Sequence, residues 1–240
     1  MSGGVSDGAG RDGRRDWILA IDTATSRVVV AAGAPHGTPL AVSTWEAGRT
    51  HGEQLLPAIG RLTGEANLRR SRIRGVIVGT GPGAFTGLRV GIATAKALAH
   101  ELHVPIAGVS TAAALLEASG AGRSGVLLLP AGPNDRTVVR TGGSAELLPG
   151  GREPGLDADA ILVALDLEGR APEDALARGD RARDGFAAAL LRLGAERLAA
   201  SGRDPADAAD DLARLVPEYV SLPRGVSHES GEVAWSRDPR

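Results

Sequence analysis

The chain has 240 residues, of which 42% are hydrophobic, 34 are glycine and none is cysteine. The lack of cysteine excludes disulfide scaffolds, thiol catalysis and cysteine-ligated zinc or iron–sulfur sites. The 27 basic and 29 acidic residues give a net charge of −2, which is not the pattern of a protein that binds RNA by itself. Lys96 is the only lysine, and this preference for arginine is typical of a GC-rich genome.

The chain contains neither a membrane-span signal nor a signal-peptide core. No stretch reaches the roughly 18 uninterrupted apolar residues that a span requires, and the N-terminus lacks an apolar segment. We therefore expect a cytoplasmic protein without a membrane partner. Residues 1–16 contain one sizeable aliphatic side chain, Val5, and are predicted to be a disordered leader.

Residues 17–108 have the pattern of an α/β lobe that opens with an antiparallel meander. Pro57 is expected to bend the first helix or to mark its true start. In chain order, this pattern predicts strands at 17–22, 27–32 and 39–45, a helix at 52–67, a strand at 75–79, a helix at 85–102 and a strand at 104–108.

The signal is weaker after this lobe, and we predict a second, smaller α/β lobe at 109–216 and a C-terminal tail at 217–240. The end, 224–240, has no periodicity and is expected to be loose. The elements predicted here are a helix at 111–118, strands at 125–129 and 137–140, a loop at 147–155 and a helix at 186–200.

The segment Gly79–Gly91 contains five glycines between a predicted strand and a predicted helix. Glycine lets a backbone, a helix or a phosphate approach closely, and free N–H groups at a helix start favour anions. Tight packing of the strand against the helix explains the same glycines. Both interpretations stay open, and the first makes Gly81 and Gly83 candidate nucleotide contacts.

The familiar motifs for other sites are absent or incomplete. No Gly-Lys-Ser/Thr triplet is present, which excludes a Walker loop, and no serine lies in a Gly-x-Ser-x-Gly setting. A relaxed dinucleotide pattern at 79–84 is weak because Pro82 removes a donor and a meander precedes it. His100 and His103 lack a third ligand, so no metal site is predicted.

The turn after the first strand carries Asp22, Thr23, Thr25 and Ser26. These side chains could bind a metal–phosphate group, or they could close the turn through bonds to the backbone. Asp22 and Thr23 are therefore the other candidate nucleotide contacts, and the sequence leaves both interpretations open.

The helix predicted at 85–102 has two faces. The basic face favours either exposure to solvent or contact with an acidic partner or a phosphate. The small-to-apolar face permits close packing with another helix. The basic face consists of Arg89, Lys96, His100 and His103, and the other of Gly87, Gly91, Ala95, Leu98 and Leu102.

Three motifs together resemble the TsaB (YeaZ) family, whose members belong to the bacterial machinery that makes N6-threonylcarbamoyladenosine in tRNA. The resemblance covers Ile18 to about Leu116, and Phe-Thr-Gly after Gly-Pro-Gly is its most specific part. The motifs are Ile-Asp-Thr-Ala-Thr-Ser at 21–26, Arg-Thr-His-Gly-Glu-Gln-Leu-Leu-Pro at 49–57 and Gly-Pro-Gly-Ala-Phe-Thr-Gly-Leu-Arg-Val-Gly at 81–91.

The resemblance implies a two-lobed fold like those of actin, hexokinase and the heat-shock ATPases, with a ribonuclease H-like mixed sheet, a meander start and flanking helices. The related catalytic subunit, TsaD, carries a His-x-x-x-His metal pair where this chain has Thr111 and Leu115. Neither side chain can hold a metal as imidazole does. The implied function is a scaffold without catalytic residues or a metal of its own.

The implied partners are a TsaD-like catalytic subunit and a TsaE-like ATPase, and tRNA is contacted only indirectly. The resemblance also allows ATP or ADP at the complex interface. When the chain is alone, it is expected to form a homodimer. Substituting arginine at Gly87 or Gly91 is expected to abolish TsaD binding and to leave the fold intact. The residues assigned to the partner interface are His51, Leu55, Ile59, Gly87, Gly91, Ala95 and Leu98.

Two other functions stay open. One is a self-sufficient nucleotide-binding phosphotransferase of the same fold that uses Asp22 and the turn at 81–83. The other is a metallopeptidase, a label once attached to relatives of this family. The second lobe departs from the family pattern, because its opening strand lacks the usual tyrosine, whereas a C-terminal Pro-x-Tyr element survives at Pro217 and Tyr219.

Overall fold

The computed structural model describes residues 15–48, 51–201, 212 and 215–220, together with the backbone of 226–229 and 232–235. The side chain of His51 and the predicted leader up to residue 14 lie outside the described part. Among the described residues, no helix is long and apolar enough to cross a membrane.

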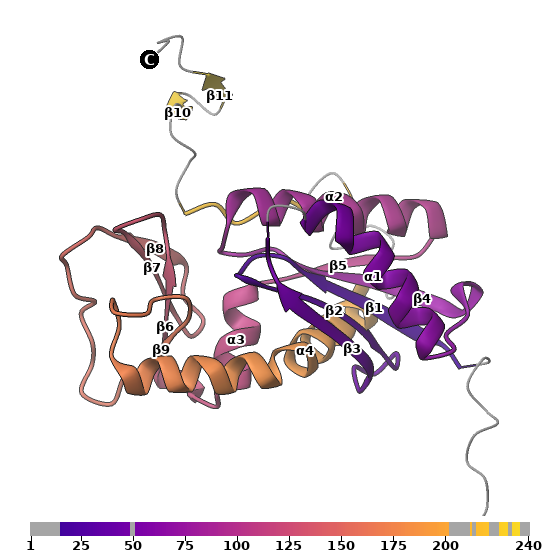
Figure 1. Cartoon of the computed structure of the whole chain (residues 1–240), viewed down its shortest axis with the longest axis horizontal. Coiled ribbons are helices and arrows are strands. Elements are labelled where there is room, and N and C mark those ends of the chain that lie inside the picture. The colour runs from indigo at the N-terminus through magenta and orange to yellow at the C-terminus, as the bar shows by residue number, and fades with distance from the viewer. Residues whose placement is uncertain are drawn as a thin grey trace, which may run out of the picture.

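A five-stranded mixed sheet forms the centre of the N-terminal part (Figure 1). The first three strands pair antiparallel, and β1 pairs parallel with β4, as β4 does with β5. The predicted meander and mixed sheet are therefore confirmed. In the spatial order β3-β2-β1-β4-β5, the strands are β3 (Pro39–Glu46), β2 (Arg27–Gly33), β1 (Trp17–Asp22), β4 (Ile73–Gly79) and β5 (Ile106–Val109).

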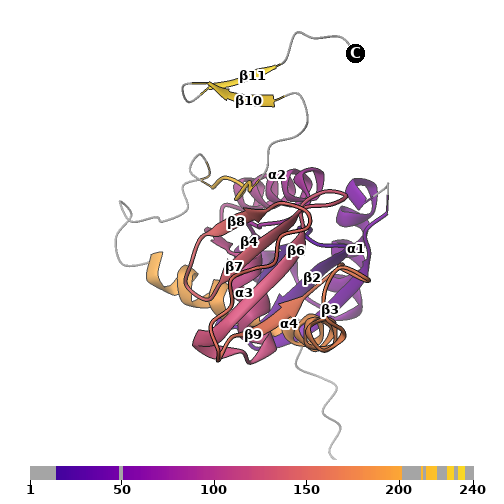
Figure 2. The ribbon, with the colours of Figure 1, turned by 90° about the vertical axis from the view of Figure 1, so that its left-hand side faces the viewer.

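A second sheet of four strands repeats this topology, in the order β8-β7-β6-β9 (Figure 2). Its first three strands are again antiparallel, and β6 pairs parallel with β9. A loop at 149–160 joins β8 to β9, in the place where the first sheet has a helix. The strands are β6 (Gly125–Pro130), β7 (Arg136–Arg140), β8 (Ala145–Leu148) and β9 (Ile161–Ala164), of which β8 and β9 were not predicted.

The helices form two layers around the first sheet (Figure 1). One layer packs on alternate side chains such as Leu19 and Ile21, and the other packs on Ile18 and Ala20, because successive residues of a strand face opposite sides. The first layer is α1 (His51–Glu65) and α2 (Phe85–Leu102), and the second is α3 (Thr111–Ser119) and α4 (Glu173–Ser201).

The second helical layer lies between the two sheets. Leu127 and Val163 of the second sheet share a core with Phe186 and Leu190 of α4 and with Ile77 of the first sheet. Helix α4 begins at Glu173, earlier than predicted, because its first turns are rich in charged residues that hide the apolar pattern. The boundary proposed between residues 108 and 109 falls inside β5, one residue before this strand of the first sheet ends. The division into lobes stays a prediction.

Helix α1 begins at His51 and continues through Pro57, so Pro57 does not mark the start of this helix.

The C-terminal end contains two further strands and a contact with the first sheet. Strands β10 (Val226–Glu229) and β11 (Glu232–Trp235) pair antiparallel, and the sequence pattern at 224–240 did not predict them. The start of the predicted tail is attached to the first sheet, because the N–H of Glu218 donates to the carbonyl of Thr80 at 2.7 Å.

Candidate functional site

Asp22 lies at the end of β1, where the first sheet meets the N-terminus of α3, and it is completely buried. Its carboxylate accepts hydrogen bonds from the hydroxyl of Thr111 at 2.7 Å and from the N–H of Ala24 at 2.9 Å. The Thr111 hydroxyl also accepts a bond from the N–H of Gly81 at 3.1 Å. This network joins the β1–β2 turn, the glycine segment and α3.

Burial raises the pKa of Asp22 from 3.8 to about 6, and the hydrogen bonds from Thr111 and Ala24 oppose part of that rise. Desolvation has the larger effect because the carboxylate meets no cation in this network. Asp22 thus has the environment of a structural carboxyl group within the core.

The glycines of the Gly79–Gly91 segment fit closely around the same turn. A methyl group on any of four of them would overlap atoms of the turn, so only glycine permits this approach. The overlapping pairs are Gly79 with the carboxylate of Asp22, Gly83 with the carbonyl of Ala24, Gly87 with the carbonyl of Thr23 and Gly91 with the hydroxyl of Thr23. The glycines bring the chain's own backbone together here, which is the packing interpretation of the sequence.

The predicted nucleotide contacts are mostly enclosed by the chain itself. Asp22, Thr23 and Gly81 are buried, and the backbone of Gly83 is exposed. The Thr23 hydroxyl donates to the carbonyl of Gly87 at 2.7 Å. A phosphate could reach the Asp22 carboxylate only after the glycine segment moved away, so nucleotide binding stays a prediction.

Thr111 and Leu115, which the family resemblance aligns with the metal pair of TsaD, do not fit a metal. The Thr111 hydroxyl is occupied by Asp22 and Gly81, and Leu115 is a buried hydrocarbon side chain in the core between the sheets. A metal ion needs nitrogen or oxygen lone pairs that are free to coordinate. These two residues therefore take structural roles.

Most residues of the predicted partner interface lie on the inner face of α1 and α2, against the chain's own core. Leu98 is half-buried against the same core, and the position of the His51 side chain is not described. The other five residues are buried on the sides of α1 and α2 that face the first sheet: Leu55, Ile59, Gly87, Gly91 and Ala95. The small residues of α2 serve contact with the chain's own β1–β2 turn. An arginine at Gly87 or Gly91 should therefore disrupt the fold, contrary to the expectation that it would spare it.

A different set of small and apolar residues forms the open side of these two helices, which we call the outer face. Leu56 is 57% exposed, and Cβ atoms added at Gly60 or Gly64 would meet no neighbour within 4 Å. Small or apolar residues recur every four positions along this face, and the sequence contains that signal. The glycines at 87 and 91, on the buried side of α2, gave a stronger signal and determined the prediction. The outer face consists of Leu56, Gly60 and Gly64 on α1 and of Ala93 and Ala97 on α2.

Phe85, at the start of α2, holds the C-terminal segment. Its ring lies 4.9 Å from the ring of Tyr219, and the guanidinium of Arg89 lies 5.2 Å from the Phe85 ring on the same helix. Leu215, also in this segment, is buried against Thr80 and Gly108. The Pro-x-Tyr element noted in the sequence thus fastens 215–220 across the ends of β4 and β5.

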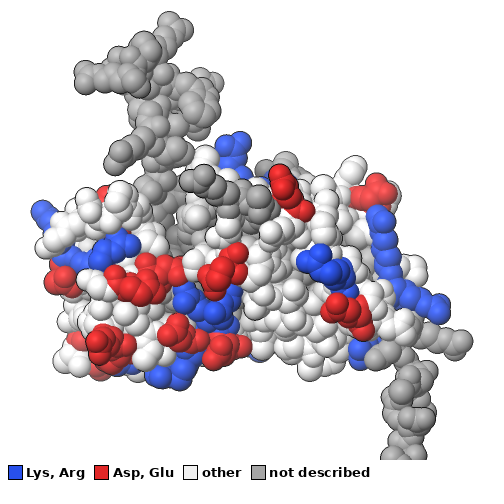
Figure 3. Space-filling model, in the orientation of Figure 1, with Lys and Arg blue, Asp and Glu red and all other residues white. Residues whose placement is uncertain are grey.

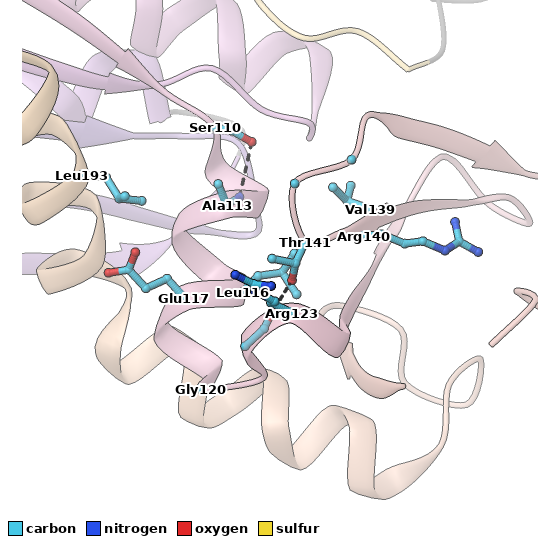
Figure 4. A pocket seen from close by; sticks show the side chains of 13 residues that line it. Ser110, Ala113, Leu116, Glu117, Gly120, Arg123, Val139, Arg140, Thr141 and Leu193 are labelled. Carbon is cyan, nitrogen blue, oxygen red and sulfur yellow. Dashed lines mark hydrogen bonds between the residues drawn. The ribbon is translucent and has the colours of Figure 1, made fainter. Parts of the chain in front are cut away.

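A cavity of about 650 Å³ opens between α3 and the β7–β8 turn (Figure 4). Its floor is apolar and includes Leu116 and Val139, and Arg123 lies at its border. The Thr141 hydroxyl on its wall donates to the carbonyl of Gly122 at 2.8 Å. None of the predicted site residues lines this cavity.

Comparison with known proteins identifies the family. The model of the tRNA N6-adenosine threonylcarbamoyltransferase (TsaD) family matches residues 43–210, which is more than half of the chain. The chain belongs to this family. The TsaB protein of Bacillus subtilis is 32% identical over 94 residues, which cover 39% of this chain and 41% of that protein. An uncharacterized protein of Mycobacterium leprae is 42% identical over 95 residues, 38% of this chain and 26% of that protein.

A solved structure agrees with this relationship. YeaZ from Pseudomonas aeruginosa matches with a TM-score of 0.64 and 25% identity, over 84% of this chain and 98% of that one. The resemblance to TsaB (YeaZ) and the predicted α/β fold class with mixed sheets are thus confirmed. The chain spans less than half the length of the curated relatives that it matches.

Proposed function

We propose that this protein is a non-catalytic subunit of a complex that makes N6-threonylcarbamoyladenosine in tRNA, and that it binds and activates a TsaD-like catalytic subunit. The observation that carries the proposal is the family match, combined with the structural roles of Thr111 and Leu115. The resemblance to the family aligns these two residues with the metal pair of TsaD. The closed Asp22 turn fits the same role, because its carboxylate is committed to the fold.

The outer face is the surface that we assign to the catalytic subunit. Two neighbouring helices present small residues there, so the helices of a partner could approach closely, and Leu56 supplies an exposed apolar side chain. A homodimer of the isolated chain would use the same face. A TsaE-like ATPase, and ATP or ADP at the complex interface, complete the proposed assembly in the cytoplasm.

Reconstitution tests this function. The full chain is co-expressed with the TsaD-like and TsaE-like proteins of the same genome, and tRNA modification is measured for each protein alone and for the mixtures. We expect the chain to co-purify with the catalytic subunit and to be required for modification, while showing no turnover alone. Failure to co-purify, or ATP-dependent transfer by the isolated chain, would contradict the proposal and favour a self-sufficient phosphotransferase.

A further inference from the structure

Four arginines lie together at the end of the first sheet where β4 begins. Arg69, Arg70, Arg72 and Arg74 fall within six residues that pass through the short 3-10 turn Arg70–Arg72 into β4. The indole N–H of Trp17 donates to the carbonyl of Arg69 at 2.9 Å. Ile73, the first residue of β4, is buried in the core. The backbone that carries these four arginines, the arginine edge, is therefore fixed.

The arginine edge carries more positive charge than its acidic neighbours neutralise. Asp16 lies 2.8 Å from Arg72 and 3.0 Å from Arg74, so one carboxylate serves two guanidinium groups. These contacts lower the pKa of Asp16, with the hydrogen bond from Arg74 as the largest cause. Arg70 is 70% exposed and lies 3.9 Å from an equally exposed Glu101, a contact that neutralises little.

Several arginines elsewhere in the described chain have a carboxylate of their own. Arg27 pairs with Glu46, and Arg178 pairs with Asp174. At the arginine edge, four cations share two carboxylates, although the whole chain is slightly acidic. Figure 3 shows basic side chains along the right-hand end of the molecule, near the point where the described chain begins.

The position of the arginine edge suits a long anionic ligand that also meets a partner on α1. Gly64 of the outer face lies at the end of α1, and Arg69 follows only five residues later. A nucleic acid bound by a subunit that covers the outer face could extend over this end of the sheet. Arginine is well suited to such contacts because its planar fork binds phosphate oxygens through two hydrogen bonds.

We propose that the arginine edge binds backbone phosphates of the tRNA in the assembled complex. This inference rests on the proposed function and adds a direct RNA contact to a subunit whose composition predicts only an indirect one. The contact would be independent of nucleotide sequence, because it reads phosphates and not base edges.

Salt-dependent tRNA binding by the complex tests this inference. The complex of the full chain with its catalytic subunit is titrated with an unmodified tRNA transcript at several salt concentrations. We expect the triple variant Arg69→Gln, Arg70→Gln and Arg74→Gln to bind roughly tenfold more weakly at moderate salt. The slope of log K against log salt should fall by about two to three.

Two control variants accompany this test. Arg152→Gln with Arg181→Gln removes two exposed arginines away from the arginine edge and should leave the affinity unchanged. The triple variant Arg69→Lys, Arg70→Lys and Arg74→Lys keeps the charge and should retain most of the binding.

Co-purification separates the two proposals. If the glutamine variant still forms the complex and binds tRNA like the wild type, the arginine edge is not an RNA site. If the variant loses the catalytic subunit but the free proteins bind tRNA unchanged, the edge is a protein contact, which also overturns the inference. If the wild-type chain never forms the complex, it is the proposed function that fails.

Discussion

The hydroxyl of Thr111 lies 2.7 Å from the carboxylate of Asp22, although the two residues are 89 positions apart in the chain. This bond ties the first helix of the layer between the sheets to the turn that opens the first sheet. Both side chains are fully buried, so the bond is shielded from solvent. Because Asp22 is buried, its protonation makes the free energy of unfolding depend on pH.

Stability should decrease as the pH rises from about 4 to 7. Burial raises the pKa of Asp22 to about 6 in the folded protein, whereas the unfolded chain releases the proton near pH 3.8. Between these two pH values, Asp22 keeps its proton in the folded state and loses it in the unfolded state. The contribution of Asp22 to the free energy of unfolding is therefore complete below pH 3.8 and is lost as the pH passes 6. A shift of this size corresponds to about 3 kcal/mol.

The measurement is the free energy of unfolding of the wild type and of Asp22→Asn across this range. We expect the difference between the two proteins to change by up to about 3 kcal/mol, with the wild type relatively more stable at low pH. Asp157→Asn, at an exposed position in the loop before β9, is the control and should give a constant difference. A constant difference for Asp22→Asn as well would show that burial does not raise the pKa of this carboxyl group in the folded protein.

Adding one methyl group should have opposite effects at two helical glycines. In Gly87→Ala, the new Cβ would overlap the carbonyl oxygen of Thr23, and we expect a loss of about 1–3 kcal/mol or more. In Gly60→Ala, the Cβ meets no neighbour within 4 Å, and we expect a gain of about 0.5–1 kcal/mol from the higher helix propensity. Thermal unfolding of both variants checks this, and similar effects at both sites would contradict the packing described for α2.

Substitutions on the outer face should affect assembly without affecting the fold. Leu56→Asp and Gly60→Arg place a charge on the open side of α1, where there is room for it. We expect each variant to keep the wild-type melting temperature within about 2 °C and to lose most co-purification with the catalytic subunit. Ser144→Arg, in the exposed β7–β8 turn, serves as the control. Unimpaired complex formation by both α1 variants would move the interface elsewhere.

The sequence predicted the first sheet well because its strands are short apolar runs bounded by polar turns. All five of its strands and helices α1 to α3 lie close to the predicted ranges. The second sheet was harder to predict, since β8 is a short strand with exposed residues, and β9 is only four residues long. Helix α4 was predicted only from Phe186 onward, because its earlier turns are dominated by charged side chains.

The site could be predicted only as far as which residues come together. The sequence singled out Asp22, Thr23 and the glycine segment as candidate nucleotide contacts, and the structure brings them into one network. It could not show which face of α2 turns inward, because a stripe of Gly87, Gly91 and Ala95 suits contact with a partner helix and with the chain's own turn equally well. That choice depends on tertiary packing, since Thr23 lies 64 residues before Gly87.

Removing Arg183 should destabilise the protein more than removing other paired arginines. Its guanidinium bonds Asp166 at the end of β9, and Asp166 in turn accepts a hydrogen bond from the Ser26 hydroxyl at 2.5 Å. The side chains of Arg183 and Asp166 are only 14% and 20% exposed, so Arg183→Met leaves a carboxylate with little access to water. We expect a loss of about 2–4 kcal/mol in chemical unfolding, since an unpaired, largely buried charge is costly. Arg178→Met, on the same helix, removes an ion pair with the exposed Asp174 and a hydrogen bond to the carbonyl of Leu162, but it leaves no buried carboxylate behind. This variant should cost only about 1 kcal/mol. Equal losses for the two variants would mean that the link from the β1–β2 turn to β9 and α4 contributes no more than a surface ion pair.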